Sequence, residues 1–267
     1  VKAAQLGTQL LVNIYGIGVL SSTIVIMYIA FSNYRDPSDD AVDLADYPLV
    51  SCLVAVRDDV RIIERCIRSV LAQSYPRIEL LVVDDMSVDG TRELLARLGE
   101  DLPIRVMLLD ANVGKKRALT LAARYAEGAF FVFTDSDCIL DECAIERCML
   151  AFQAHPGLGA VSGHARALNA DRNTLTKIQD VWYDGQFGIA KAAESVFRSV
   201  TCVSGPVAAF RREAIDNYLP AWGGDRFLGS EFRFATDRQL TGYVLGQKWK
   251  GRKLKERYSD SPLVSEV

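Results

Sequence analysis

The stretch Phe130–Cys138, FFVFTDSDC, decides the fold. Its four apolar residues, 130–133, predict a buried strand, with a buried helical turn as the alternative. Asp135 and Asp137 follow directly. Open α/β sheets bind ligands at the carboxyl edge of their strands. Mg²⁺ and Mn²⁺ take one or two carboxylates there and complete their coordination with water and phosphate oxygens. We therefore predict that Asp135 and Asp137 hold Mg²⁺ or Mn²⁺ against a diphosphate. The alternative is a polar loop after a strand.

Composition limits the classes of protein to consider. With 267 residues, 49% hydrophobic content and a net charge of −3, the chain is long enough for one large α/β domain or a domain with an appendage. Near-neutral charge, without an RNP-like or zinc-finger pattern, gives no reason to expect a nucleic-acid partner. Six cysteines without a C-x-x-C pair favour reduced, mostly buried thiols in a cytosolic compartment. Two histidines and no G-x-S-x-G elbow argue against a Ser/His hydrolase, and both histidines are interpreted as structural or surface residues.

The N-terminal region has the pattern of a membrane anchor. Residues 9–31 are apolar and uncharged, and at about 1.5 Å per residue they cover a bilayer core of about 30 Å. We predict a transmembrane helix over 1–32; the alternatives are a signal peptide and a buried core helix. The apolar part exceeds a usual h-region, and no A-x-A-like site follows. Lys2 and Arg35 flank opposite ends, so charge alone does not orient the span. The polar, acidic residues 33–46 predict a juxtamembrane linker, and the globular domain is expected over 47–267.

Apolar runs and helical patterns alternate after residue 47. Strands are predicted over 49–56, 78–83, 104–109 and 130–133, and helices over 60–72, 92–98 and 115–125. This alternation predicts a parallel sheet with right-handed crossovers, which is an α/β fold. The carboxyl ends of the strands then share one edge of the sheet.

Further polar residues follow these strand ends. Asp84 and Asp85 come after the second strand, where they can accept hydrogen bonds from a base amide or a ribose hydroxyl. Lys115 and Arg117 stand at a helix start, which is unfavourable for the helix dipole unless a phosphate binds there. A solvated cationic turn is the alternative.

Two segments nearer the C-terminus allow two interpretations each. Residues 175–193 carry Trp182, Tyr183 and Phe187 on a helical pattern; core packing is predicted for most of these rings, with stacking on sugar rings as the alternative. The cationic segment 248–257, KWKGRKLKER, fits a solvated helix face or a segment lying on anionic lipid.

Six blocks, in this order, carry a resemblance to a known family: LVSCLVAVRDD, LLVVDDMSVDGT, NVGKKRAL, FTDSD, CVSGPVAAFRRE and FATDRQLT. Together they resemble the catalytic domain of processive family-2 glycosyltransferases, most of all the hyaluronan synthases and next the nodulation-type chitin synthases. The resemblance spans roughly residues 47–245.

This resemblance implies a GT-A fold and inverting transfer from a UDP-sugar, UDP-GlcNAc or UDP-glucuronate or both, to the end of a growing β-linked polysaccharide. Reduced cysteines and a nucleotide-diphosphate substrate would put the catalytic domain in the cytosol, so the expected location is the inner plasma membrane with the catalytic domain on the cytosolic side. The residue roles that it implies, together with the readings above, form one set: Asp84 and Asp85 at the uridine, Lys115 and Arg117 at the diphosphate, Asp135 and Asp137 at the metal and UDP, Cys202, Ser204, Gly205, Pro206 and Trp182 at the acceptor, and Asp237 as catalytic base.

The physical argument for Asp237 does not need the family. An acceptor hydroxyl that attacks C1 must lose a proton, and a positioned carboxylate can take it. Asp237 also begins an apolar-periodic helical pattern, so an N-cap is its alternative role; the base is favoured, and the two roles are compatible. Glu231 is the second candidate for the base.

Alternatives to a hyaluronan-type enzyme remain. Thr236 before Asp237 is closer to the Thr-Glu-Asp of cellulose synthases, so a chitin-oligosaccharide or cellulose-type synthase is also considered. The downstream Gln-x-x-Arg-Trp signature of the family is absent from the 267 residues, so a C-terminally shortened, UDP-binding but catalytically incomplete fragment is another expectation. A nucleotidyltransferase ranks last, because no glycine-rich triphosphate loop is present.

Overall fold

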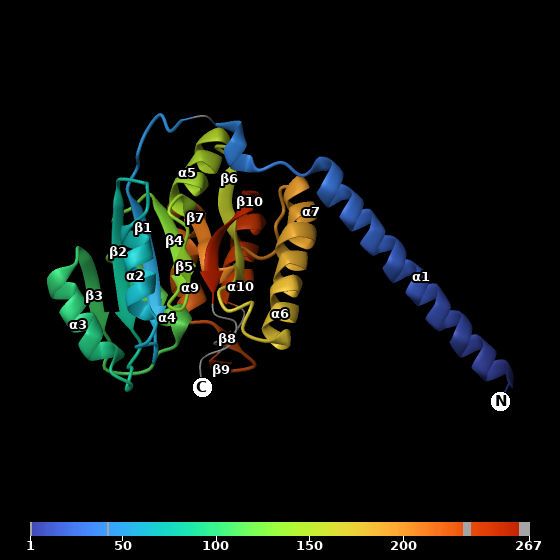
Figure 1. Ribbon diagram of the computed structural model, residues 1–267, viewed down its shortest axis with the longest axis horizontal. Coiled ribbons are helices and arrows are strands. Elements are labelled where there is room, and N and C mark those ends of the chain that lie inside the picture. The colour runs from blue at the N-terminus through green and yellow to red at the C-terminus, as the bar shows by residue number, and fades with distance from the viewer. Residues whose placement is uncertain (1, 42, 232–235, 262–267) are drawn as a thin grey trace.

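One mixed sheet of eight strands organises the domain, in the order β3-β2-β1-β4-β7-β6-β10-β5. The computed structural model describes the backbone of residues 2–41, 43–231 and 236–261, and fewer side chains near the ends of these ranges. Helices cover both faces of the sheet, and a long N-terminal helix projects from the domain (Figure 1). This arrangement confirms the predicted α/β class.

The first half of the domain follows the predicted alternation, with every element end within a few residues of expectation. Its elements are β1 (Val50–Val56), α2 (Ile63–Leu71), β2 (Ile78–Asp84), α3 (Thr91–Asp101), β3 (Ile104–Leu108), α4 (Lys115–Ala123) and β4 (Phe130–Asp135). These four strands pair in parallel in the order β3-β2-β1-β4. Their carboxyl ends therefore share one edge, as predicted.

The second half extends the sheet in mixed directions. Its elements are β5 (Ile139–Leu140), α5 (Ala144–Ala154), β6 (Leu158–Ala167), α6 (Thr174–Gly185), the π-helical η2 (Gln186–Ala190), α7 (Lys191–Val196), η3 (Gly205–Val207), β7 (Ala208–Arg211), α8 (Arg212–Ile215), η4 (Asp216–Tyr218), α9 (Leu219–Gly223), the hairpin β8 (Arg226–Phe227) and β9 (Ser230–Glu231), α10 (Thr236–Gly246) and β10 (Lys250–Ser261). Strand β7 runs antiparallel to both of its neighbours, β4 and β6.

The core forms two layers because successive side chains of a strand point to opposite faces. In β1, Cys52 and Val54 pack on the face covered by α2 and α5, whereas Leu53 packs on the face covered by α4. Every residue of β1 is buried, as expected for a central strand of a parallel sheet covered on both sides. The six cysteines are free, and four of them are buried, which agrees with the prediction.

The cationic C-terminal segment is a strand, so its interpretation as a solvated helix face is wrong. Strand β10 pairs with β6 in parallel. Lys253 and Leu254 are 1% and 0% exposed, and the Lys253 amide donates to Ser195 Oγ. Lys253 therefore belongs to the sheet interior and not to a membrane-facing surface. Pairing with a partner that lies far away in sequence overrode the local charge pattern.

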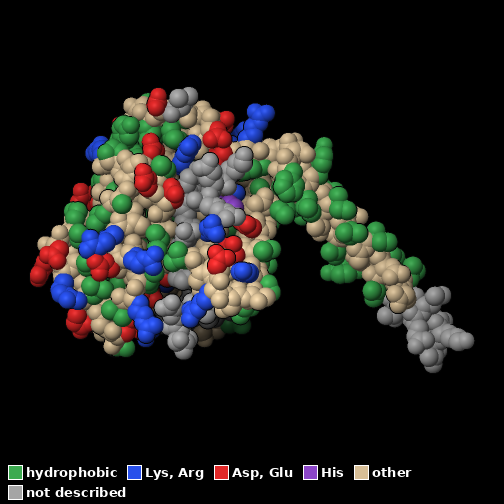
Figure 2. Space-filling model, in the orientation of Figure 1, with side chains coloured by type: hydrophobic (Ala, Val, Ile, Leu, Met, Phe, Trp, Pro, Cys, Tyr) green, Lys and Arg blue, Asp and Glu red, His purple; other side chains and the backbone are tan. Residues whose placement is uncertain are grey.

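The N-terminal helix α1 (Lys2–Asn33) is long and apolar enough to cross a membrane by length and composition, with mean hydropathy 2.0 in its most apolar window. Figure 2 shows hydrophobic and uncharged side chains along it, beside a body of mixed charge. The polar segment after it is partly packed. Its 3-10 helix η1 (Pro37–Asp40) is capped by Asp36, whose carboxylate accepts a hydrogen bond from the Ser38 amide. An ion pair of 3.7 Å between Arg147 and Asp39 connects η1 to α5.

Candidate active site

The strand register brings the predicted acidic residues to one edge. In the parallel sheet Ala55 lies beside Asp135, and Val56 lies beside Asp84. Asp84 and Asp85 therefore end the strand on one side of β1, and Asp135 ends the strand on the other. The carboxyl end of β1 therefore lies between the two groups.

Asp85 fixes the loop that leads into α4. Its carboxylate accepts hydrogen bonds from the amides of Val113 at 2.7 Å and Gly114 at 2.8 Å, and from Asn112 Nδ2 at 3.1 Å. Gly114 has φ +83°, a conformation that favours glycine. Asp85 is 4% exposed, so its carboxylate aims the start of α4 and holds Lys115 in position.

Asp84 points into the protein. It is fully buried and accepts from the amide of Ser87 at 3.2 Å and from Arg92 Nη1 at 3.4 Å. A carboxylate enclosed in this way supports the turn after β2. A direct contact with a nucleotide, as predicted for Asp84, would require this turn to open.

Lys115 reaches across the edge to Asp135 and forms an ion pair with Oδ1 of that carboxylate. Burial alone would lower the pKa of Lys115, but the carboxylates of Asp135 and Asp237 outweigh it and raise that pKa. The lysine is therefore a fixed positive charge between two acidic groups. It is suited to a diphosphate because the carboxylates hold it in place.

Arg117 does not join Lys115. Residues two apart on a helix are separated by about 200°, so Arg117 is exposed on the far side of α4. Lys116, between them, turns inward to Asp225 at 3.2 Å and Gln239 at 2.6 Å. The prediction that Arg117 lies at the diphosphate is therefore not supported by its position.

Asp135, Asp137 and Cys138 present ligand atoms within 4.8 Å of one another. Burial raises the pKa of Asp137, and the nearby carboxylates of Asp135 and Asp59 raise it further. A divalent cation would offset this repulsion. The two carboxylates fit Mg²⁺ or Mn²⁺, because these ions prefer hard oxygen ligands. The buried Cys138 thiol would suit a softer metal and is not counted among the ligands.

Gly205 lies between the carboxylates of Asp135 and Asp237. A Cβ at Gly205 would lie 2.8 Å from Asp135 Oδ2, and the Gly205 amide donates to Asp237 Oδ2 at 2.9 Å. Pro206 follows in η3, and its carbonyl accepts from Thr134 Oγ1 at 2.8 Å. The 202–206 loop is thus fixed to the end of β4, and a glycine is needed where the chain passes Asp135.

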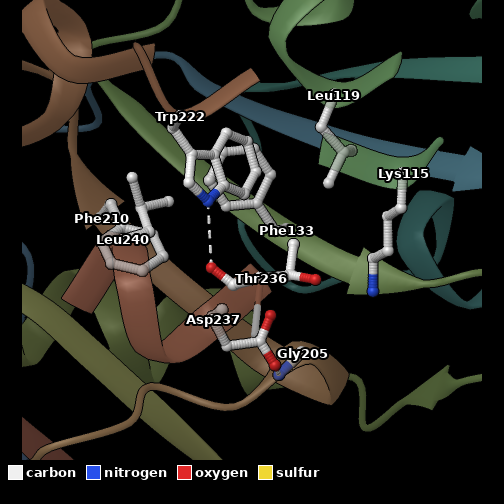
Figure 3. Close-up of a pocket in the computed structure, with 10 residues that line it drawn as sticks. Lys115, Leu119, Phe133, Gly205, Phe210, Trp222, Thr236, Asp237 and Leu240 are labelled. Carbon is white, nitrogen blue, oxygen red and sulfur yellow. Dashed lines mark hydrogen bonds between the residues drawn. The ribbon is translucent and has the colours of Figure 1, made fainter. Parts of the chain in front are cut away.

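Asp237 lies in the first turn of α10, as predicted. Burial raises its pKa, and the opposing effect of Lys115 does not cancel that rise. Its carboxylate faces a pocket whose rim includes Lys115 and Gly205. Figure 3 shows Lys115 and Asp237 entering this pocket from α4 and α10. Glu231, the second candidate, ends β9, and its side chain lies outside the described residues.

The pocket floor is apolar. It is formed by Phe133, Trp222 and Leu240, and the Trp222 indole donates to the Thr236 carbonyl at 3.1 Å. This hydrogen bond, drawn in Figure 3, ties α9 to the residue before Asp237. The apolar floor explains why burial raises the pKa of Asp237.

The acceptor-side residues divide into two groups. Ser204 Oγ forms a hydrogen bond with Lys191 Nζ, and Cys202 is half-buried. Trp182, by contrast, is 62% exposed on α6, so the structure does not bring it to the pocket. The next residue, Tyr183, is half-buried, and burial and then the Asp135 carboxylate raise its pKa. Core packing is correct for Phe187, at 4% exposed, and wrong for Trp182.

Three residues near the site were not predicted: Asp59, Tyr183 and Lys191. Asp59 forms a hydrogen bond with Ser136 Oγ between the two predicted metal ligands. The sequence does indicate Asp59, because this residue follows the end of a predicted strand, as Asp84 does. Lys191 is 9% exposed, and its ammonium lies 4.4 Å from the Phe187 ring centroid. No sequence pattern marks it.

The mixed sheet, its flanking helices and its polar carboxyl edge define the GT-A class of α/β enzyme, and solved structures share this fold. The mannosyltransferase PcManGT from Pyrobaculum calidifontis, in complex with GDP-Man and Mn²⁺, aligns with TM-score 0.66 and 21% identity over 92% of this chain and 66% of that one. S. aureus TarS 1–349 in complex with UDP-GlcNAc aligns with TM-score 0.60 and 18% identity over 82% of this chain and 60% of that one.

The sequence comparisons give the family. Residues 51–219 match the family described as "Glycosyl transferase family 2". The chain is 29% identical to hyaluronan synthase of Streptococcus pyogenes over 240 residues, which are 88% of this chain and 56% of that protein. It is 31% identical to an N-acetylglucosaminyltransferase of Azorhizobium caulinodans over 228 residues, 83% of this chain and 57% of that protein. The chain therefore belongs to glycosyltransferase family 2 and is a glycosyltransferase. It spans little more than half the length of these relatives.

Proposed function

We propose that the chain transfers a sugar from a UDP-sugar to the end of a growing β-linked polysaccharide, with inversion at the anomeric carbon. The observation that carries this proposal is the convergence of three groups on one edge of the sheet. Asp135 forms an ion pair with Lys115, Gly205 packs against Asp135, and the Gly205 amide binds Asp237. A diphosphate and an acceptor hydroxyl can thus be held side by side.

In this proposal Asp237 is the general base. It accepts the proton of the acceptor hydroxyl as that oxygen attacks C1 and the bond to UDP breaks. Lys115 donates to the leaving diphosphate, whose charge grows in the transition state. Asp135 and Asp137 would hold Mg²⁺ or Mn²⁺, which would offset the diphosphate charge. Gly205 lets the acceptor loop lie against Asp135 without a side chain between them.

UDP-GlcNAc is the donor that the relatives support best. One similar protein is named an N-acetylglucosaminyltransferase, and one similar fold is a complex with UDP-GlcNAc. Similarity to a hyaluronan synthase adds UDP-glucuronate as a second donor. We place α1 in the inner plasma membrane and the catalytic domain on the cytosolic side.

The test is a donor panel on the full chain reconstituted in phospholipid vesicles with Mn²⁺. Radiolabelled UDP-GlcNAc is supplied alone, with UDP-glucuronate, or replaced by UDP-glucose. Polymer from UDP-GlcNAc alone indicates a chitin-type product, and polymer only with both donors indicates hyaluronan. Asp237→Asn is the matched inactive variant. Absence of both polymer and UDP release with every donor would contradict the proposal.

A further inference from the structure

Lys116, on α4, is buried, although lysine is among the residues least often found inside a protein. It is 4% exposed, and its ammonium donates to Asp225 Oδ2 at 3.2 Å and to Gln239 Oε1 at 2.6 Å. An ammonium that leaves water needs such partners. The three side chains come from separate parts of the chain: α4, the residue before β8, and α10. We call these three side chains the Lys116 clamp.

Both partners of the lysine are themselves fixed. Gln239 Nε2 donates to the Tyr243 hydroxyl at 3.4 Å, one turn further along α10, which leaves Oε1 for the lysine. Burial would raise the pKa of Asp225, but hydrogen bonds from Gln239 and Lys116, together with the Lys116 charge, outweigh it and lower that pKa. The clamp therefore holds an ionised carboxylate.

The clamp joins the two helices that carry the proposed reacting groups. Lys115 precedes Lys116 on α4, and Asp237 lies two residues before Gln239 on α10. Lys115 and Asp237 enter the pocket from these two helices (Figure 3). Consecutive residues of a helix point about 100° apart, so α4 lines the pocket with one lysine and binds α10 with the next. The bond from Lys116 to Gln239 thus restrains α10 relative to α4.

Other hydrogen bonds hold the start of α10 against different elements. The Gly205 amide donates to Asp237 Oδ2 at 2.9 Å, and the Trp222 indole donates to the Thr236 carbonyl at 3.1 Å. These two bonds position α10 against the 202–206 loop and α9. Neither of them reaches α4, so they do not set the position of Asp237 against Lys115.

We propose that the Lys116 clamp positions the base for sugar transfer, by holding Asp237 at the separation from Lys115 that an acceptor hydroxyl and a leaving diphosphate require. This inference rests on the proposed function, in which Asp237 is the base and Lys115 binds the diphosphate. A displacement of about 1 Å between such groups can cost about 10²-fold in rate. Lys116, Asp225 and Gln239 are positioning residues, because they act through Asp237.

The first test is Gln239→Leu in the full chain reconstituted in phospholipid vesicles. This variant leaves the ion pair between Lys116 and Asp225 in place, so it should fold. The kcat for transfer, per UDP-binding site counted by titration of the same preparation, should fall at least tenfold. The Kd for UDP with Mn²⁺ should stay within twofold of wild type, because Lys115 and its partner Asp135 are unchanged.

A second set of variants changes the lysine. Lys116→Met should lower kcat in the same way, and Lys116→Arg, which keeps the charge and the donors, should return kcat to within threefold of wild type. Arg124→Met, at an exposed position at the end of α4, is the matched control and should change neither kcat nor Kd.

A double variant distinguishes positioning from a merely structural role. Because the clamp acts through Asp237, adding Gln239→Leu to Asp237→Asn should lower the residual rate by less than twofold. Losses that multiply in the double variant would overturn the proposal. So would an unchanged kcat in both Gln239→Leu and Lys116→Met, or a loss of UDP affinity as large as the loss of kcat. A wild-type rate in Asp237→Asn alone would instead contradict the proposed base, so the two failures are distinguishable.

Discussion

The backbone amide of Gly205 donates a hydrogen bond to Oδ2 of Asp237 across 2.9 Å. The same glycine lies so close to Asp135 that a Cβ would be 2.8 Å from its carboxylate. One residue therefore connects the acid at the end of β4 with the acid at the start of α10. Changes at Asp237 and at Gly205 should therefore have different effects, the first on the transfer rate and the second on Mn²⁺-dependent UDP binding.

Asp237→Asn tests the base. The amide oxygen still accepts from Gly205, but it cannot take the acceptor proton, so the transfer rate should fall by about 10²–10⁴-fold. UDP binding should change little. Steady-state rates and UDP titrations on the same preparations separate these effects, and a rate within tenfold of wild type would remove Asp237 from the mechanism.

The pH dependence of transfer follows from the same residue. Burial raises the pKa of Asp237, and Lys115 opposes that rise only in part. The ionised form, which accepts the proton, is lost as pH falls through this raised pKa. The rate should therefore drop on an acid limb whose midpoint lies above the value of about 3.9 for an ordinary aspartate. A rate that stays constant down to that value would contradict the assignment.

Gly205→Ala tests the contact with Asp135. The new Cβ must displace the Asp135 carboxylate, because both of its oxygens lie within 2.9 Å of that position. Mn²⁺-dependent UDP binding should weaken at least tenfold, about 1.4 kcal/mol. Gly242→Ala on α10 is the matched control, since a Cβ there meets nothing within 4 Å. Equal UDP affinities in the two variants would argue against this contact.

Asp85→Ala tests the loop that positions Lys115. It leaves the amides of Val113 and Gly114 without their acceptor, at a cost of about 1–3 kcal/mol in the free energy of unfolding. UDP affinity should fall with it. Chemical denaturation in detergent measures the first effect and titration the second. Asp110→Ala, at a fully exposed carboxylate, should stay within about 0.5 kcal/mol of wild type, and a matching loss there would show that the effect is not specific.

Lys191 gives a prediction on the acceptor side. Its ammonium binds Ser204 and favours the ionised form of Asp237. Lys191→Met should raise the acceptor KM and move the acid limb to higher pH, because the pKa of Asp237 rises when this charge is lost. Lys191→Arg should restore both, and UDP affinity should be unchanged throughout. An unshifted pH profile in Lys191→Met would leave the lysine a merely structural role.

The parallel half of the fold could be predicted because local patterns and a fixed handedness determine it. Asp84, Asp85 and Asp135 follow apolar runs, and parallel strands must end at one edge. Which of these carboxylates faces the cleft was not predictable. The difference between the buried Asp84 and the loop-binding Asp85 depends on the turn that Ser87 closes.

Errors arose where long-range contacts decide the outcome. The segment around Lys253 is a charged run with few apolar residues, yet it pairs with β6 far away in sequence. Trp182 and Tyr183 are neighbours on a helical pattern, and only the packing of α6 shows that Trp182 is exposed and Tyr183 half-buried. Arg117 was misplaced for a simpler reason, since helical geometry already separates it from Lys115.

The most direct test of the central claim is calorimetric titration of UDP into the full chain, with Mn²⁺ and with a chelator, for wild type and Asp137→Asn. UDP binding to the wild type should depend on Mn²⁺, and it should weaken at least tenfold, about 1.4 kcal/mol, in the variant. UDP binding of equal strength with and without Mn²⁺, and in both proteins, would contradict a nucleotide site built on Asp135 and Asp137.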